Sequence, residues 1–358
     1  MRGVVSASFI IVSTHPPRMR ILFLGAGATG GYYGARLVQA RTAAEVSFLL
    51  RTRAKAELLR DKGLRVLSPH HGDVRLDPQS FSAFSTILEE EEQTATSVKR
   101  KPYDVILLCC KAYDLESACQ SLKPFADRDP AALILPVLNG LAHMDVLDRM
   151  FGKERVVGGV SHVATTLLAD GITIKQLTPV HRLTFGARPG NSPQTRETLE
   201  RLRDAFAKSI VEVRLTDAIE QELWEKFVLL ATLAGSTCLA RASVGDIMNT
   251  DDGERIVHSM LNECIRCAER AGHPPRMQLQ SDIYARLTER GSPLTASMMR
   301  DMEGKGKTEA RHIVYDMLRR CREGSTPSNY LEIAWMVLQA RDQRVSREEN
   351  ESKQQPKL

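Results

Sequence analysis

The sequence predicts an α/β fold: a doubly wound parallel sheet in the N-terminal part of the chain, followed by an all-α C-terminal domain. Three observations lead to this expectation. An apolar segment near the N-terminus runs directly into a glycine-rich turn and a helix-compatible run, over residues 21–41. Short apolar segments then alternate with helix-compatible ones as far as residue 138, which is the order of a parallel sheet. From Asp217 onward the apolar periodicity is helical.

The glycine-rich turn has the spacing of a dinucleotide-binding site. In the segment ILFLGAGATGGYYG, Gly25 permits a tight turn, Gly27 lets the backbone approach a pyrophosphate, and Gly30 lets the following helix pack against the strand. The amide groups at the start of that helix then hold the phosphates. The alternative is a glycine-rich turn that binds nothing. We predict a Rossmann-type domain in which the whole turn contacts the cofactor, including the intervening Ala26, Ala28 and Thr29.

The residue that follows the second predicted strand indicates which dinucleotide is bound. This strand, residues 45–50, is followed by Arg51, where an NAD-preferring site carries Asp or Glu for the ribose hydroxyls. A guanidinium instead suits a 2'-phosphate. The alternative is a solvated arginine at a strand end. The sequence therefore favours NADP(H) over NAD(H).

The other elements of the first domain follow in order along the chain. The acidic and polar stretch EEEEQTATSVKRKP, which begins at Glu89, offers no core face and is predicted to be a surface loop. Short β-like segments between residues 156 and 215 are expected to extend the first sheet. The full order expected before them is strand 20–24, helix 31–41, strand 45–50, helix 53–62, strand 64–67, strand 104–110, helix 115–123 and strand 132–138.

Changes in composition divide the chain into four segments. They are a leader over residues 1–18, an NADP-binding Rossmann domain over 19–216, a helical substrate and catalytic domain over 217–342, and a disordered tail over 343–358. The tail is charged and lacks periodicity. The leader contains no acidic residue and is either a weak signal or transit peptide, or an over-extended reading frame before a natural start at Met19. The second interpretation is favoured.

Composition restricts the class of protein. The 358 residues are 42% hydrophobic and 26% charged, as in ordinary globular domains. The net charge of +5 is spread among acidic residues, so no nucleic-acid partner is expected. No apolar run approaches the roughly 20 residues of a membrane helix, so no membrane association is expected. Seven cysteines indicate reduced thiols in a cytoplasmic protein, and the Cys264-x-x-Cys267 pair has no partners for a metal site.

Three polar residues lie where chemistry is expected. Lys226 interrupts an apolar helical run, and partial desolvation lowers its pKa toward neutrality, as a proton donor to a forming alkoxide requires. Lys111 and Asn139 each close a predicted strand, at the carboxyl edge of the sheet where ligands bind. The plainer alternatives are a lysine at the edge of an amphipathic helix and ordinary residues at loop starts.

Taken together, the motifs of the chain resemble the ketopantoate reductase family. The resemblance runs from Met19 to about Arg341, and the ordered spacing of its motifs is more specific than the glycine turn alone. It implies hydride transfer from NADPH to a 2-oxo acid, as in the reduction of 2-dehydropantoate (ketopantoate) to pantoate in pantothenate biosynthesis. The motifs are GAGATGGYYG, CCKAYDLESA around Lys111, PVLNG around Asn139, LWEKF around Lys226, and SMMRDMEGKGKTE from Ser297 to Glu309.

The resemblance also implies a role for individual residues. Lys226 would be the proton donor, the glycine turn would hold the pyrophosphate, and Arg51 would hold the 2'-phosphate. Dimerisation through the helical domain follows by analogy with the family alone. The other expected contacts are Lys111 and Asn139 with the nicotinamide side, Asn139 also with the substrate, Ala164 with the cofactor, Ser297 with the substrate carboxylate, and Glu309 with the cofactor ribose.

The chain departs from the family at the substrate pocket. Members that reduce ketopantoate carry asparagine four and eight residues after the catalytic lysine, and another further on. This chain has Leu230, Ala234 and Val244 there. Because a polar substrate binds less well when its hydrogen-bond partners become apolar, the pocket is expected to prefer a different or more apolar 2-oxo acid. A non-catalytic, NADPH-binding regulator is the alternative from another class.

Overall fold

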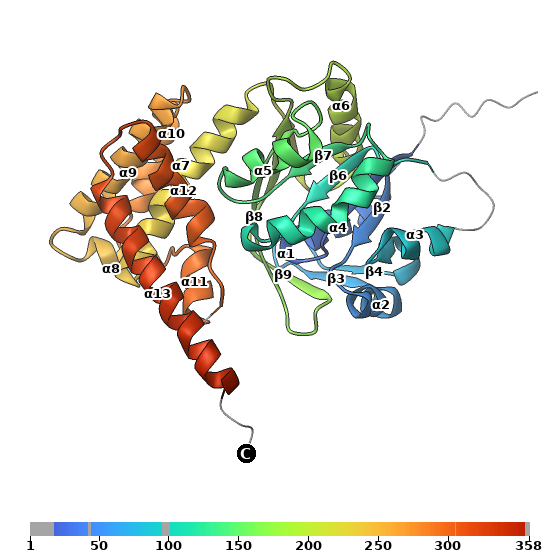
Figure 1. Cartoon of the computed structure of the whole chain (residues 1–358), viewed down its shortest axis with the longest axis horizontal. Helices are drawn as coiled ribbons and strands as arrows, with labels where there is room; N and C mark the ends of the chain where they lie inside the picture. The colour runs from blue at the N-terminus through green and yellow to red at the C-terminus, as the bar shows by residue number, and fades with distance from the viewer. Residues whose placement is uncertain (1–17, 42–43, 95–100, 305, 355–358) are drawn as a thin grey trace, which may run out of the picture.

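The computed structural model describes residues 18–41, 44–94, 101–304 and 306–354. Figure 1 shows two parts side by side: strands and helices from the N-terminal and middle chain, in blue to green, and helices from the C-terminal chain, in yellow to red. The predicted fold class, a parallel sheet with helices followed by a helical region, is confirmed. Apart from Arg18, the predicted leader lies outside the described residues.

The first sheet is built around a buried central strand. Alternate side chains of this strand enter different cores, because Ile21 and Phe23 pack on one face and Leu22 and Leu24 on the other. A parallel sheet that is covered on both faces has near-continuous apolar strands, as here. All strands run parallel, in the order β5 (Ser82–Phe84), β2 (Ala44–Leu49), β1 (Met19–Leu24), β6 (Val105–Leu108) and β7 (Leu133–Pro136).

Apart from an isolated parallel bridge between Val156 and Ile134 of β7, the β-like segments after residue 156 form a second sheet, so the expectation that they extend the first one is wrong. The expected third strand of the first sheet, β3, also belongs here. The strand order is β10 (Glu212–Leu215), β9 (Thr173–Gly186), β3 (Leu64–Leu67) and β4 (Val74–Leu76), with β8 (Gly158–Leu167) antiparallel to β9. Residues 177–180 in the middle of β9 are all exposed, so neither face of this part of the strand is covered, unlike the buried strands of the parallel sheet.

Helices cover both faces of the first sheet. The helix α1 (Ala28–Gln39) packs against the second sheet as well, because a Cβ at Gly31 would lie 2.4 Å from the Cδ1 of Ile174 in β9. Two helices, α5 and α6, form where the sequence predicted no regular element. The remaining helices of this part are α2 (Arg53–Lys62), α3 (Ile87–Thr94), α4 (Leu115–Arg128), α5 (Ala142–Phe151) and α6 (Thr195–Phe206).

The helix α3 replaces the first part of the predicted surface loop. Its Glu90 is only 1% exposed. The carboxylate of Glu90 accepts a hydrogen bond from the Tyr103 hydroxyl at 2.6 Å and pairs with Arg128 at 2.9 Å. The loop prediction is therefore wrong here, because partners outside the segment give this acidic helix a buried face. Residues 95–100 of the same stretch lie outside the described chain.

The C-terminal part is a cluster of helices around a shared apolar core. That core includes Leu141 and Val160 from the α/β part, so the two parts pack on one another. The central helix α7 is long and apolar enough to cross a membrane by length and composition alone, contrary to expectation, but 72% of its apolar window is buried in the protein. The helices are α7 (Ile219–Ala240), α8 (Val244–Met248), α9 (Gly253–Arg270), α10 (Met277–Leu287), α11 (Ser297–Glu303), α12 (Asp316–Glu323) and α13 (Asn329–Gln354).

The last helix corrects the prediction of a disordered tail. The helix α13 continues to Gln354, so residues 343–354 are helical, and Figure 1 shows this end of the helix projecting toward the C-terminus. Arg344 and Glu348, and Arg347 and Glu351, pair one turn apart at 3.8 Å each. Such pairs stabilise an exposed helix that has no apolar periodicity.

Replacing Gly30 by alanine is expected to destabilise the fold. A Cβ at Gly30 would lie 2.4 Å from the Gly25 carbonyl oxygen and 2.9 Å from the Cβ of Cys109, both parts of the packed strand edge. Such overpacking costs about 1–3 kcal/mol of unfolding free energy. Gly27→Ala is the matched control, since a Cβ there meets nothing within 4 Å. Thermal unfolding followed by circular dichroism measures the difference, and equal Tm values for the two variants would contradict it.

Candidate active site

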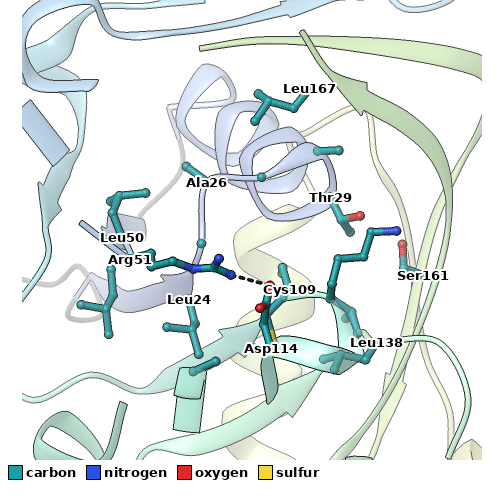
Figure 2. A pocket seen from close by; sticks show the side chains of 18 of the residues that line it. Leu24, Ala26, Thr29, Leu50, Arg51, Cys109, Asp114, Leu138, Ser161 and Leu167 are labelled. Atoms are coloured by element: carbon teal, nitrogen blue, oxygen red, sulfur yellow. Dashed lines mark hydrogen bonds and ion pairs between the residues drawn. The ribbon is translucent and has the colours of Figure 1, made fainter. Parts of the chain in front are cut away.

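A cavity of about 750 Å³ lies at the carboxyl edge of the first sheet. Its walls come from the ends of β1, β2, β6 and β7, from β8, and from α7 of the helical part. Figure 2 shows Arg51 reaching toward Asp114 on one side of this space, with Thr29 and Ser161 on the other. The structure brings ten of the predicted site residues to the cavity wall: Gly25, Ala26, Gly27, Ala28, Thr29, Arg51, Lys111, Asn139, Lys226 and Glu309.

Three predicted site residues are placed elsewhere. Gly30 lies beneath the turn, packed against Gly25 and Cys109. Ala164 lies at the register shift of β8, between Val163 and Thr165. Ser297 is the exposed first residue of α11. None of these three is among the residues that line the cavity.

The turn from β1 into α1 presents backbone amides to the cavity. Gly25 adopts a left-handed conformation, with φ of +97°, and its amide donates to the Leu49 carbonyl at 2.9 Å. The helix begins at Ala28, and its first turn carries no acidic residue. The amides of a first helical turn have no partner within the helix, and they favour an anion. These residues therefore fit the pyrophosphate of a dinucleotide.

Arg51 lies at the rim of the cavity, directly after β2. Its guanidinium forms an ion pair with Asp114, drawn as a dashed line in Figure 2, and its side chain is 72% exposed. Lys55 of α2 also lines the cavity. Sequence reasoning missed Asp114, because nothing in the local pattern connects it with a residue that is 63 positions earlier.

Two acidic residues of the helical part approach Lys111. The Lys111 Nζ is 3.3 Å from Asp301 Oδ2 and 3.4 Å from Glu309 Oε2. Glu309, 4% exposed, also accepts a hydrogen bond from the Ala112 amide at 3.0 Å. Burial alone would lower the pKa of Lys111, but Glu309 and Asp301 outweigh it and raise the pKa. Sequence reasoning missed Asp301, although it lies inside the motif that ends at Glu309.

Lys226 reaches from α7 across to the second sheet. Its Nζ donates a hydrogen bond to the backbone carbonyl of Ser161 in β8 at 2.7 Å. Burial of the ammonium group lowers the pKa of Lys226 to about 8, and the charge of Glu309 acts in the opposite direction. An amine with this pKa is largely protonated at neutral pH and can also lose its proton readily, as a general acid must. Ser161 is a further site residue that the sequence did not indicate.

Two histidines near Lys226 stay uncharged at neutral pH. Burial and the charge of Lys226 lower the pKa of His143, on α5, to about 3. The same two causes lower the pKa of His162, on β8, to about 4. Neither imidazole therefore adds a positive charge that would oppose protonation of the lysine.

The turn at Asn139 packs against the segment that follows Glu309. Gly140 has φ of +79°, and a Cβ there would lie 2.4 Å from the carbonyl oxygen of His312. His312 belongs to a π-helical segment, Arg311–Tyr315. Segments of this kind occur often at functional sites. This close contact places Asn139 and Glu309, from two different parts of the fold, at one cavity.

Potential metal ligands and thiols are dispersed. Within the described ranges, no group of three or more His, Cys, Asp or Glu side chains is arranged to hold a metal ion. All seven cysteines are free thiols. Cys264 and Cys267 are buried on α9, away from the cavity wall.

Fold and site together define a nicotinamide-dependent oxidoreductase: a glycine turn that can hold a dinucleotide faces the same cavity as a half-buried lysine of lowered pKa. The sequence profile described as "Ketopantoate reductase PanE/ApbA" matches residues 21–190, and the profile of its C-terminal domain matches residues 218–342. The chain belongs to the ketopantoate reductase family. Members of this family are oxidoreductases that act on a CH–OH group. Membership of the family is evidence that this protein reduces a 2-oxo acid.

Individual proteins resemble this chain over almost its whole length. An uncharacterized oxidoreductase, YkpB of Bacillus subtilis (strain 168), is 30% identical over 321 residues, 90% of this chain and 98% of its own. A PanE/ApbA family ketopantoate reductase from Ralstonia eutropha JMP134 has a TM-score of 0.75 at 21% identity, covering 92% and 100%. A D-mandelate dehydrogenase solved with NADH and anilino(oxo)acetate has a TM-score of 0.74 at 18% identity, with the same coverage. The two structures show the shared fold.

Glu309→Gln is expected to lower the pKa of Lys226 below its value of about 8, because the glutamate charge favours the ammonium form. The measurement is a pH titration of the lysine side chain by NMR with 13C-labelled lysine, assigned with a Lys226→Arg variant. Asp301→Asn is the matched control. It removes the other acidic partner of Lys111 and should leave the Lys226 titration in place. A Lys226 pKa that rises in Glu309→Gln would contradict the electrostatic assignment.

Proposed function

We propose that this protein is an NADPH-dependent reductase that converts a 2-oxo acid to the 2-hydroxy acid, with Lys226 as the proton donor. The observation that carries the proposal is the environment of Lys226, whose pKa is lowered to about 8 in the cavity that the glycine turn faces. Because the chain belongs to the ketopantoate reductase family, ketopantoate is the first substrate to test. Its reduction would give pantoate, as in pantothenate biosynthesis. The free thiols support a cytoplasmic location.

In this proposal, some residues of the cavity bind the cofactor and Lys226 transfers the proton. A bound NADPH supplies the hydride that reaches the carbonyl carbon of the substrate. The glycine turn would bind the pyrophosphate through the amides at the start of α1, and Arg51 would bind the 2'-phosphate. Lys226 gives a proton to the carbonyl oxygen as the C=O bond becomes a C–O single bond. Its neutral amine then regains a proton from solvent, which completes the cycle.

The face of α7 next to Lys226 supports a second candidate substrate. Leu230 and Ala234 follow the lysine by one and two helical turns, so they share its side of the helix. Ala234 is 2% exposed and Leu230 is half-buried. Neither side chain can donate or accept a hydrogen bond. Neither residue is among those that line the cavity, and both belong to the helix face behind it. Because that face offers no hydrogen-bond partner to a hydroxylated substrate, a 2-oxo acid with an apolar side chain is the second candidate.

Lys226→Ala is expected to lower kcat by roughly 10²–10⁴-fold while NADPH affinity stays unchanged, because the variant removes a general acid and not a phosphate contact. In the unaltered protein, kcat should fall as pH rises through about 8, where the ammonium loses its proton. The measurement is steady-state oxidation of NADPH with ketopantoate and with bulkier, more apolar 2-oxo acids.

The outcomes of this experiment separate the candidates. Efficient turnover of ketopantoate would support the family substrate, and strong turnover of apolar 2-oxo acids alone would support the second candidate. NADPH binding without turnover of any 2-oxo acid would favour a non-catalytic regulator. A Lys226→Ala variant with unchanged kcat would remove the assigned role of the lysine.

Arg51→Ala is expected to raise the KM for NADPH by roughly 10–100-fold and to leave the KM for NADH unchanged. This range corresponds to losing charge-assisted hydrogen bonds of about 1.5–3 kcal/mol to the 2'-phosphate. Arg53→Ala is the matched control, because Arg53 is equally exposed and pairs with Glu57 and Glu89 outside the cavity wall. An equal loss with both cofactors would place Arg51 away from the 2'-phosphate.

A further inference from the structure

Two adjacent tyrosines of α1 have no part in the proposed function so far. Tyr32 and Tyr33 are both 0% exposed, and their rings pack edge to face with centroids 5.7 Å apart. The hydroxyl of each reaches the second sheet. Tyr33 Oη is 2.8 Å from Ser161 Oγ and 3.0 Å from the Arg182 carbonyl oxygen. The helix that follows the glycine turn is thus fixed to the hairpin of β8 and β9.

The direction of these hydrogen bonds follows from the chemistry of their atoms. Burial raises the pKa of Tyr33, so its hydroxyl keeps its proton. A carbonyl oxygen only accepts, so this proton is donated to Arg182. Ser161 Oγ must then donate to Tyr33 Oη. The hydroxyl of Tyr33 therefore holds β8 and β9 together at neighbouring positions of their ladder, where His162 is paired with Arg182.

Ser161 connects this anchor to the candidate proton donor. Its side chain is bonded to Tyr33, and its backbone carbonyl accepts the hydrogen bond from Lys226 Nζ at 2.7 Å. The next residues of β8 are irregular, with a register shift between Val163 and Thr165. A strand with a bulge is less constrained by its ladder. A side-chain anchor at Ser161 is therefore well placed to fix the orientation of its peptide group.

We propose that Tyr33 is a positioning residue of the reductase, which acts through Ser161 to hold the Lys226 ammonium in register with the glycine turn. The inference rests on the proposed function, because it assigns Tyr33 a part in proton donation. The helix that binds the dinucleotide and the helix that carries the acid are joined by a chain of two hydrogen bonds. Tyr33 touches neither substrate nor reacting atoms.

The other groups that face Lys226 come from separate elements. Glu309 lies on the segment before the π-helix, His143 on α5 and His162 on β8. In the described chain the hydrogen bonds of the Tyr33 hydroxyl go to Ser161 and Arg182. Removing the Tyr33 hydroxyl would therefore affect Lys226 through the orientation of the Ser161 peptide group, and the charge on Glu309 would not change.

The test compares Tyr33→Phe with Tyr32→Phe. Tyr32 is a matched control, since it is the adjacent buried residue of the same helix and its hydroxyl lies 3.1 Å from both Gln176 Oε1 and His181 Nδ1 of the same sheet. Tyr33→Phe should lower kcat by roughly 10–100-fold, the range for a misplaced reacting group, with the KM for NADPH within about twofold. The fall of kcat at high pH should move to lower pH, because the ammonium loses a fixed acceptor.

Tyr32→Phe should lower Tm by a similar amount and leave kcat and its pH profile in place. Identical kcat values and pH profiles for the two variants would overturn the proposal, since a merely structural role affects both alike. If Tyr33→Phe does not fold, Ser161→Ala breaks the same contact from the other side and keeps the carbonyl, and it should give the same loss of kcat. A Lys226→Ala variant with full turnover would remove the proton-donor role on which this inference rests, whereas an unaltered protein that turns over no 2-oxo acid would end the proposed function itself. If Lys226→Ala is inactive while Tyr33→Phe keeps the kcat and pH profile of the unaltered protein, only the positioning role of Tyr33 is contradicted.

Discussion

The site depends on keeping one ammonium group in a place that burial makes unfavourable for charge. Moving a charged group out of water is costly unless a partner compensates it. For Lys226 the compensation is partial, a single carbonyl and a nearby glutamate charge, and its pKa falls to about 8. Lys111 shows the opposite balance in the same cavity, because Asp301 and Glu309 lie close enough to raise its pKa. The two lysines of this cavity are therefore suited to different roles. Lys226 can release a proton near neutral pH, whereas Lys111 stays charged.

This constraint explains why the second sheet is needed. The acceptor for Lys226 is on β8, and the helix that carries the lysine packs on the same strand through the shared core that includes Val160. The helix α1 lies against β9 at Gly31, so the glycine turn and the acceptor strand are fixed relative to one another. The parallel sheet alone would present the glycine turn without a carbonyl to hold the Lys226 ammonium.

How much of this could be predicted from sequence depends on the distance of the contacts along the chain. The glycine turn and the apolar run around Lys226 are local patterns, and the structure confirms the local conformation predicted for each, a strand-to-helix turn and a helix. Ser161, Asp114 and Asp301 were not, because their partners are 65, 63 and 190 positions away. The same reason applies to α3, whose buried face is created by Tyr103 and Arg128 beyond the segment. The pairing of β3 with β9 in a second sheet likewise leaves no local signal.

In the proposed reductase, substrate preference and the acidity of Lys226 would both depend on one face of α7. Leu230 and Ala234 follow Lys226 on that face, at two positions where the resemblance to ketopantoate-reducing enzymes implies asparagine. As apolar residues they would offer a substrate no hydrogen-bond partner and would place no polar group on this side of the helix. Less polar surroundings favour the neutral amine and lower the lysine pKa. In the proposed reductase, an exchange of asparagine for these apolar residues would lower the lysine pKa as well as alter the substrate preference. The charge of Glu309 acts in the opposite direction and raises that pKa. A charge such as that of Glu309 near an apolar helix face is what a lysine would need to remain a proton donor near neutral pH.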